Sequence, residues 1–337
     1  MKIHDSTAPV SNPKIGELKP RGYIVSHLSS VHACLDRLGI GVPVAWLYGV
    51  TGYAFMLNIP QGVNCAGPTL WDWRSIKDHM PFLGADLSQF VYAQKGEKDF
   101  AAQKQKGITF TKEMFAEGVP LYGCEFGFPE FYTLQKADDT GFTYAWMGLL
   151  DMQAFTVERS WEDFGTIDVG VLFVSAVKRA VEKPDDMKAI SAALSFAVAV
   201  GHAEAGFLGG ADVGLRGYDR WITNLTDGSL MEGVWCHPHG TTHNAANWWE
   251  CRSHAGEFLV QCAGKVGDDL GKRFLRAAEH YRDVAHALAR VKSWFPWGMS
   301  EELPSKELVE KTAKELTRAR ESESRGLALL DEVQRMI

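Results

Sequence analysis

The pattern of apolar residues changes near residues 180–184, and this change limits the fold more than any other feature. Between residues 115 and 173 the chain has short segments rich in aromatic and β-branched residues, as strands have, and residues 138–141 (Asp-Asp-Thr-Gly) have the composition of a hairpin turn. After residue 184, apolar residues recur at helical spacing in four long segments. The sequence therefore predicts an α+β protein in which an antiparallel sheet precedes an all-helical domain.

The length of the chain and the position of this change suggest the domain boundaries. A chain of 337 residues is longer than most single cores, which favours about two domains. Residues 1–20 contain three prolines among polar residues and are predicted to be an N-terminal arm. We expect an α+β domain at 21–182 and a helical domain at 183–337.

Charge and hydropathy exclude several classes of partner. A net charge of −7 with a pI near 5.9 argues against a nucleic-acid binder, and no apolar run is long enough for a membrane span. The N-terminus lacks the apolar stretch of a secretion signal, and the six cysteines include no CxxC pair, which favours reduced thiols. We therefore expect a cytoplasmic protein that binds a small molecule, alone or as a homo-oligomer.

Two segments of the N-terminal half predict helices. Residues 29–38 place apolar side chains at helical spacing and are followed by Gly39, Gly41 and Pro43, which are helix stop signals. Residues 45–59 mix aromatic and β-branched residues with two glycines, which predicts a helix, a tight turn and then a strand.

Three segments of the N-terminal half carry a resemblance to known proteins: SHLSSVHACLDRLGI (26–40), WLYGVTGYAFMLNI with NCAGP after it (46–68), and PEFYTLQKADDTGFTYAWM (129–147). They resemble the papain-like cysteine-peptidase core, and more closely the bacterial proteins related to the N-terminal domain of the butirosin-biosynthesis acyltransferase. Farther on, GLRGYDRWITNL, HNAANWWECRSHAGEFL and AAEHYRDVA resemble the helical domain that accompanies such cores. The resemblance implies a papain-like core followed by a helical domain.

The resemblance also points to two site positions at which this chain departs from the family. Papain-like enzymes use a cysteine at the start of the first helix and a histidine that opens a central strand. Counting back from Gly39 places Ser26 at the nucleophile position, and counting back from Asp138 places Glu130 at the histidine position. A carboxylate with an ordinary pKa near 4.3 is a weak base for an alcohol.

Each of these two residues has a second interpretation. Ser26 has the residue type and position of a helix N-cap. Glu130 follows Phe128 and Pro129, so its carboxyl group is either desolvated, with a raised pKa, or exposed. His27 adjoins Ser26 in sequence but points away from it in regular structure, so we expect it in the core or on the surface.

Other residues of the N-terminal half complete the expected site. Cys65 lies in a loop whose backbone N–H groups would stabilise a thiolate, although an inert packed thiol is the alternative. Small-molecule clefts are lined by aromatic residues with a few polar groups. The aromatic residues of this chain therefore either line such a cleft or form the core between the two domains. The expected catalytic residues are Ser26, Cys65 and Glu130, and the expected substrate-binding residues are Tyr53, Trp71, Tyr132 and Tyr218.

The helical half contains a group of metal-ligand residue types. Histidine suits Zn, Fe, Cu or Ni, and the spacing from His243 through Glu250 to His254 places these side chains on one helix face with Asn247. The candidate ligands of a transition metal, Zn or Fe, are His237, His239, His243, Glu250 and His254. A metal-free hydrogen-bond network between the domains and a solvated surface are the alternatives, because the spacing matches neither HExxH nor Glu-x-x-His.

Three hypotheses of function follow. The first is a small-molecule enzyme of acyl-transfer or amide/ester hydrolase type with its site in the cleft between the two domains. The second is a metal-dependent enzyme of the His-rich helical half. The third is a non-catalytic ligand-binding pseudoenzyme, which the missing Cys–His pair suggests.

Overall fold

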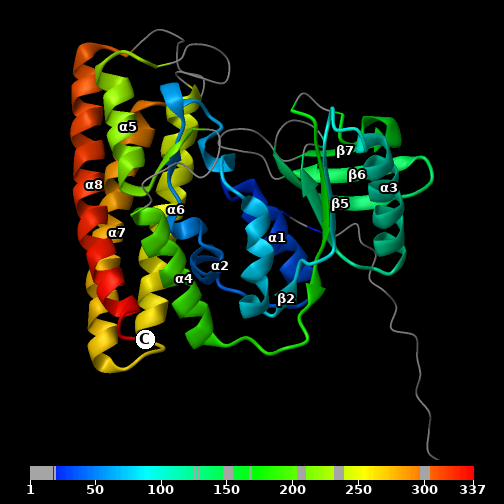
Figure 1. Ribbon diagram of the computed structural model, residues 1–337, viewed down its shortest axis with the longest axis horizontal. Coiled ribbons are helices and arrows are strands. Elements are labelled where there is room, and N and C mark those ends of the chain that lie inside the picture. Colours follow the sequence, from blue (N-terminus) through cyan, green and yellow to red (C-terminus); the bar gives the residue numbers. More distant parts are fainter. Residues whose placement is uncertain are drawn as a thin grey trace, which may run out of the picture.

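The strand-like segments between residues 115 and 173 form part of one antiparallel sheet, as the sequence predicts. The structure is a computed structural model that describes residues 18, 20–124, 126, 130–146, 155–166, 169–202, 210–230, 239–296 and 304–337. These residues form a mixed α+β protein whose C-terminal half is mainly helical, which confirms the predicted class (Figure 1).

The main sheet has six strands in the order β3-β8-β4-β5-β6-β7, and all neighbouring strands are antiparallel. The strands are β3 (Phe90–Gln94), β4 (Leu121–Cys124), β5 (Phe131–Ala137), β6 (Gly141–Trp146), β7 (Phe155–Ser160) and β8 (Val171–Ala176). The carboxylate of Asp138 accepts hydrogen bonds from the N–H groups of Thr140 and Gly141, at 2.8 and 3.2 Å. These bonds form the predicted hairpin turn between β5 and β6.

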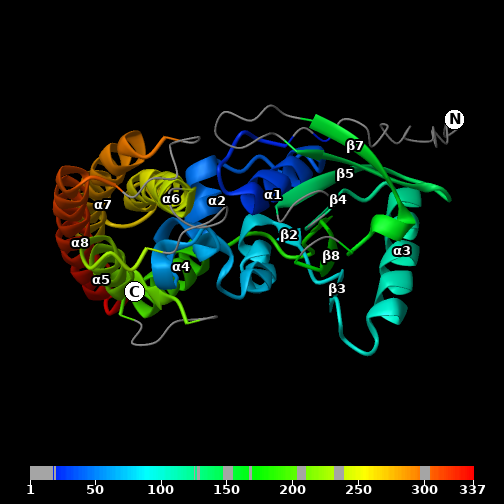
Figure 2. The same ribbon diagram turned by 90° about the horizontal axis from the view of Figure 1, so that it is seen from above.

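Alternation along the strands gives the sheet two apolar faces. Leu121 and Tyr122 are consecutive in β4, and because strand side chains alternate, they lie in two different hydrophobic cores. Helix α1 (Ser26–Arg37) covers the face that bears Tyr122, and α3 (Phe100–Ala116) covers the opposite face (Figure 2). The main sheet with α1 and α3 is called the sheet layer below.

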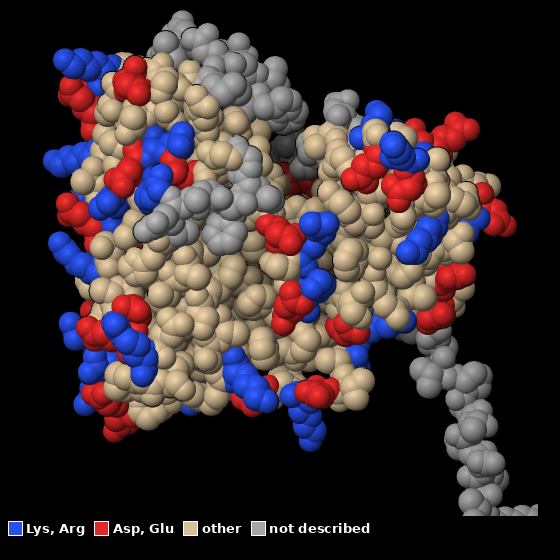
Figure 3. Space-filling model, viewed as in Figure 1, with Lys and Arg blue, Asp and Glu red and all other residues tan. Residues whose placement is uncertain are grey.

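The remaining α-helices pack together in what we call the helical bundle. They are α2 (Val44–Val50), α4 (Asp186–Gly201), α5 (Gly214–Thr226), α6 (His239–Ala263), α7 (Asp268–Trp294) and α8 (Lys306–Gln334). The helices α4 to α8 follow the sheet in sequence, as the periodicity after residue 184 predicts. In Figure 3, acidic and basic side chains are mixed over the outer side of this bundle.

Short elements connect the two parts. The two-residue strands β1 (Asn58–Ile59) and β10 (Asp212–Val213) pair with each other, as do β2 (Ala85–Asp86) and β9 (Lys178–Arg179). The 3-10 helices are η2 (Tyr53–Phe55), η3 (Gln61–Val63), η4 (Gly67–Thr69), η5 (Trp73–Asp78), η6 (Met80–Leu83) and η7 (Trp161–Asp163). Gly52 has a φ of 84° between α2 and η2, which is the predicted tight turn.

The hydrophobic core crosses the predicted boundary between residues 182 and 183. Helix α2 precedes the boundary in sequence but packs on α6 of the helical bundle. The approach is close, since a Cβ atom at Gly49 would lie 2.1 Å from the ring of Phe258. One core therefore contains side chains from α1, from α2 and from the helices of the bundle that follow the boundary.

No helix in the described part of the chain combines the length and the apolar character that a membrane crossing requires. Figure 3 shows the surface hollowed where the helical bundle and the sheet layer meet.

Candidate functional site

Ser26 and Glu130 meet where the start of α1 packs on the start of β5. Ser26 is the first residue of α1, and Glu130 directly precedes β5, on which α1 packs. The Ser26 hydroxyl donates a hydrogen bond to Oε2 of Glu130, and the N–H of Phe131 donates to the Ser26 Oγ at 3.2 Å. Ser26 and Glu130, which the sequence comparison placed at the two family positions, are therefore hydrogen-bonded although 104 positions separate them in the sequence.

The capping interpretation of Ser26 is wrong. The N-cap of α1 is Val25, and no side chain caps this helix from that position. Instead, the carboxylate of Glu250 on α6 accepts hydrogen bonds from the N–H groups of Ile24 and Val25, both at 2.9 Å. The Ser26 hydroxyl is consequently available for its bond to Glu130.

The environment of Glu130 changes its acidity. Burial raises the pKa of this carboxyl group to about 7, and the hydrogen bond from Ser26 opposes only part of the shift. Of the two interpretations from sequence, the desolvated acid with a raised pKa is confirmed. A carboxylate with a pKa near 7 is a much stronger base than one near 4.3, so the objection based on ordinary acidity does not hold here.

His27 lies in an aromatic cage beside this pair. Its Nδ1 is 2.6 Å from the Tyr53 hydroxyl and its Nε2 is 3.1 Å from the Tyr122 hydroxyl, while its ring stacks on Phe131 at 4.1 Å. Burial lowers the pKa of His27 to about 3, so the imidazole is neutral at pH 7. A neutral imidazole has one donor and one acceptor, which matches two hydroxyl groups.

We expect His27 to make the stability of the protein fall in acid. The unfolded histidine, with a pKa of 6.5, takes up a proton that the folded one accepts only near pH 3. The contribution to stability is therefore complete above about pH 6.5 and decreases by up to about 1.4 kcal/mol per pH unit toward pH 3. Thermal unfolding of His27→Gln, whose amide also donates and accepts, should show a smaller loss between pH 6.5 and 4.

The control for this experiment is His286→Gln, which removes an exposed histidine from α7. It should leave the pH dependence of the melting temperature unchanged. Parallel curves for His27→Gln and the wild-type protein would show that His27 does not titrate in this way.

The structure places the Cys65 loop against the helical bundle. The Cys65 carbonyl oxygen is 3.0 Å from Nδ1 of His243, and Asn244 Nδ2 donates to the Asn64 carbonyl at 2.7 Å. Both partners lie in the first turns of α6, and Cys65 itself is half-buried. The Ser26–Glu130 pair lies in the sheet layer and the Cys65 loop lies on the helical bundle. That the Cys65 thiol shares a site with this pair therefore stays a prediction.

The four predicted substrate-binding aromatics do not line one cleft. Tyr53 and Trp71 are in edge-to-face contact, with ring centroids 4.8 Å apart, on the α1 side of the sheet. Tyr132 lies in the core on the α3 side. The Tyr218 hydroxyl donates to Glu323 at 2.6 Å inside the helical bundle. All four side chains are buried, which agrees with the alternative that they form core.

The predicted metal ligands are partly engaged in other contacts. Oε2 of Glu250 also accepts a hydrogen bond from the Tyr48 hydroxyl at 2.7 Å, and His254 packs on the ring of Tyr48 at 4.4 Å. Burial lowers the pKa of His243 to about 4. These contacts form a hydrogen-bond network between α6 and the N-terminal half, the metal-free alternative of the sequence analysis.

Two of the predicted ligands fall outside this description. His237 lies outside the described residues, and His239 begins α6 but its side chain is not described. Among the side chains that the structure does describe, no group of three or more His, Cys, Asp or Glu residues could hold a metal ion.

Comparison with models of known protein families gives no match, and neither does comparison with curated proteins. The function of the protein is therefore inferred from the geometry of the site.

Proposed function

We propose that the protein is a small-molecule enzyme of the acyl-transfer or amide/ester hydrolase type, with Ser26 as nucleophile and Glu130 as general base. The observation that supports this proposal is the hydrogen bond from the Ser26 hydroxyl to a carboxyl group whose pKa burial raises to about 7. The proposed relationship to papain-like proteins has the same support, because the pair occupies the start of the first helix and the start of a central strand.

The proposed reaction begins with proton transfer from the Ser26 hydroxyl to Glu130. The Ser26 oxygen forms a bond to the carbonyl carbon of an ester or amide, and Glu130 then donates the proton to the leaving group as the acyl bond to it breaks. A water molecule or an acceptor alcohol or amine releases the acyl group in a second step. The positive end of α1 would stabilise the negative charge that develops on the carbonyl oxygen.

A labelling experiment tests the nucleophile and the base together. A fluorophosphonate probe should modify the wild-type protein at Ser26, as identified by peptide mass spectrometry. The rate should rise with pH through a midpoint near 7, because only the ionised Glu130 accepts the proton. Glu130→Gln should reduce the labelling rate by about 100-fold or more, in the range usual for loss of a general base.

The matched control is Ser29→Ala, which removes another hydroxyl group of α1 that bonds to the Arg21 carbonyl oxygen. Its labelling should equal that of the wild-type protein. Modification at a different residue, or unchanged labelling of Glu130→Gln, would contradict the proposed pair.

A second candidate function, a non-catalytic ligand-binding protein, is favoured by the low exposure of Ser26. Only 7% of the surface of Ser26 is accessible, so a substrate has little access in this conformation. This function predicts no labelling at Ser26. It also predicts that a small molecule raises the melting temperature and is recovered unchanged after incubation.

A further inference from the structure

The helical bundle holds the backbone that leads into Ser26. Residues 20–25 form neither a helix nor a strand, and α1 begins directly after them at Ser26. The N–H groups of Ile24 and Val25 donate to the two carboxylate oxygens of Glu250 on α6, although 226 and 225 positions separate these partners in the sequence. The path of the chain into α1 is therefore fixed by a side chain of the bundle.

The Glu250 carboxylate is itself fixed in place. Its Oε2 also accepts a hydrogen bond from the fully buried Tyr48 of α2, and Glu250 is only 8% exposed. Hydrogen bonds to a carboxylate are shorter and roughly twice as strong as those between neutral groups. Rotation of this carboxylate would break several of them at once, so Glu250 is a rigid anchor for residues 24 and 25.

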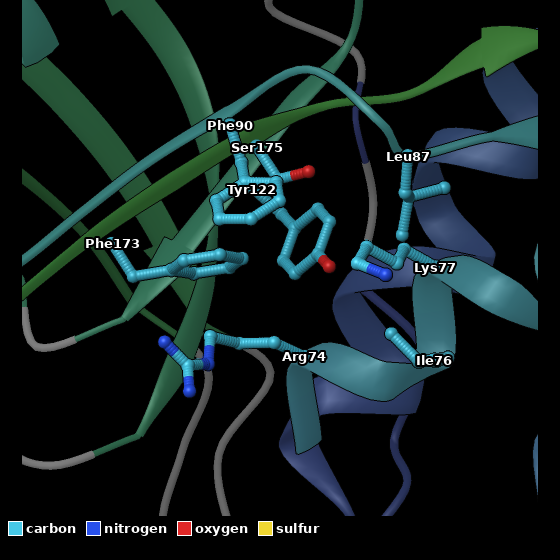
Figure 4. Close-up of a pocket in the computed structure, with 8 residues that line it drawn as sticks. All are labelled: Arg74, Ile76, Lys77, Leu87, Phe90, Tyr122, Phe173 and Ser175. Atoms are coloured by element: carbon cyan, nitrogen blue, oxygen red, sulfur yellow. The ribbon is translucent and has the colours of Figure 1, made fainter. Parts of the chain in front are cut away.

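The sheet layer holds the other side of Ser26. The Ser26 hydroxyl bonds to Glu130 and accepts from the Phe131 N–H, and Nε2 of the next residue, His27, is 3.1 Å from the Tyr122 hydroxyl. Figure 4 shows that this hydroxyl group is directed away from the sheet. The bundle thus sets the backbone before Ser26, and the sheet layer sets its hydroxyl group and the residue after it.

We propose that Glu250 is a positioning residue for Ser26, which it holds in the orientation that keeps the hydroxyl group on Glu130. This inference rests on the proposed function, in which Ser26 is the nucleophile. Glu250 acts through the backbone of residues 24 and 25, and Glu130 remains the base. Because a displacement of about 1 Å in a reacting group slows a reaction about 100-fold, a loosened start of α1 should slow the reaction of Ser26 strongly.

The kinetics of fluorophosphonate labelling at Ser26 test this role. The dependence of the labelling rate on probe concentration gives a rate constant at saturation and a half-saturating concentration. In Glu250→Gln, the rate constant at saturation should fall about tenfold or more, and the half-saturating concentration should change by less than about twofold. The midpoint of the pH dependence should stay near 7, because Glu130 is unchanged. Circular dichroism confirms that the variant is folded under the labelling conditions.

Two further variants separate positioning from stability. Glu323→Ala is the matched control, because Glu323 is also a buried carboxylate of the bundle, 3% exposed, but pairs with Arg252. While folded, it should be labelled at the wild-type rate. Tyr48→Phe removes one donor to the Glu250 carboxylate and leaves Glu250 in place, so its labelling should be about twofold to fivefold slower than that of the wild-type protein. This milder variant decides the question if Glu250→Gln does not fold.

The outcomes distinguish this inference from the proposed function. Labelling of the wild-type protein at Ser26 together with wild-type rates in folded Glu250→Gln and in Tyr48→Phe would overturn the positioning role alone. Equal slowing in Glu323→Ala would also overturn it, because the effect would then follow stability. A shifted pH midpoint in Glu250→Gln would show a direct effect on the base instead. No labelling of the wild-type protein at Ser26 would overturn both, since no nucleophile would then be positioned.

Discussion

Replacing Glu323 by alanine should lower the free energy of unfolding by about 3–5 kcal/mol, because it leaves a buried guanidinium group without its counter-ion. Arg252 of α6 is fully buried, and two of its nitrogens donate to the carboxylate of Glu323 in α8, at 2.6 and 2.9 Å. Burial alone would lower the pKa of Arg252, but the Glu323 carboxylate raises it above its ordinary value, so the arginine stays charged. Urea denaturation measures the effect.

The contacts of Arg252 explain why the loss should be large. Its Nη1 donates to the carbonyl oxygens of Ala54 and Met56, at 3.1 and 2.5 Å, and these residues precede the predicted domain boundary. Glu323 also accepts the hydrogen bond from Tyr218 of α5. The ion pair thus joins three helices of the bundle to the segment after α2.

Two further variants separate a buried pair from ion pairs in general. Asp331→Ala removes a surface pair with Arg335, at 2.7 Å, and should reduce stability by less than about 1 kcal/mol. The double variant Arg252→Met/Glu323→Leu should be more stable than Glu323→Ala alone, since it leaves no unpaired charge. If Glu323→Ala were no less stable than Asp331→Ala, the pair would not have the role assigned to it.

Replacing Glu250 by glutamine should lower the free energy of unfolding by about 2–4 kcal/mol, because the glutamine amide cannot accept all three hydrogen bonds. In the wild-type protein one carboxylate oxygen accepts from the Ile24 N–H, and the other accepts from the Val25 N–H and the Tyr48 hydroxyl. The NH₂ group of glutamine would face hydrogen-bond donors at one of these positions.

The same variant distinguishes this role from that of a metal ligand. Elemental analysis of the wild-type protein and Glu250→Gln, both purified without chelators, should give the same metal content, while denaturation shows the loss of stability. The control is Glu257→Gln on the same helix. The exposed carboxylate of Glu257 lies 3.4 Å from Nδ1 of His254, and the substitution should change stability by about 0.5 kcal/mol or less. Loss of metal with unchanged stability would instead support the metal hypothesis.

Local patterns in the sequence predict most of the elements. Helix α1, the strands β4, β5, β6 and β8, and the long helices α4, α6, α7 and α8 all follow from the spacing of their apolar residues. Helix α3 and strand β7 are not predicted. Only three residues of α3 are buried, and β7 is mostly exposed and polar, so neither has a clear apolar period.

The site was predictable only in part. The sequence predicts that Ser26 and Glu130 belong to one site, because the resemblance specifies the chain positions of the nucleophile and of its partner. The pKa of Glu130 and the cage around His27 depend on burial by residues distant in sequence. Histidine has an unperturbed pKa near neutrality, and its sequence neighbours do not reveal a shift to about 3.

The class of the fold follows from the sequence alone, because the periods of strands and helices are local properties of the chain. The sequence also indicates which residues stand at the start of α1 and β5. Tertiary packing alone buries Arg252 and Glu250 as connections between segments and places Tyr132 on the opposite side of the sheet from Tyr53. Burial and pairing arise between segments far apart in the chain, and they decide whether a charged or polar side chain is solvated, structural or reactive.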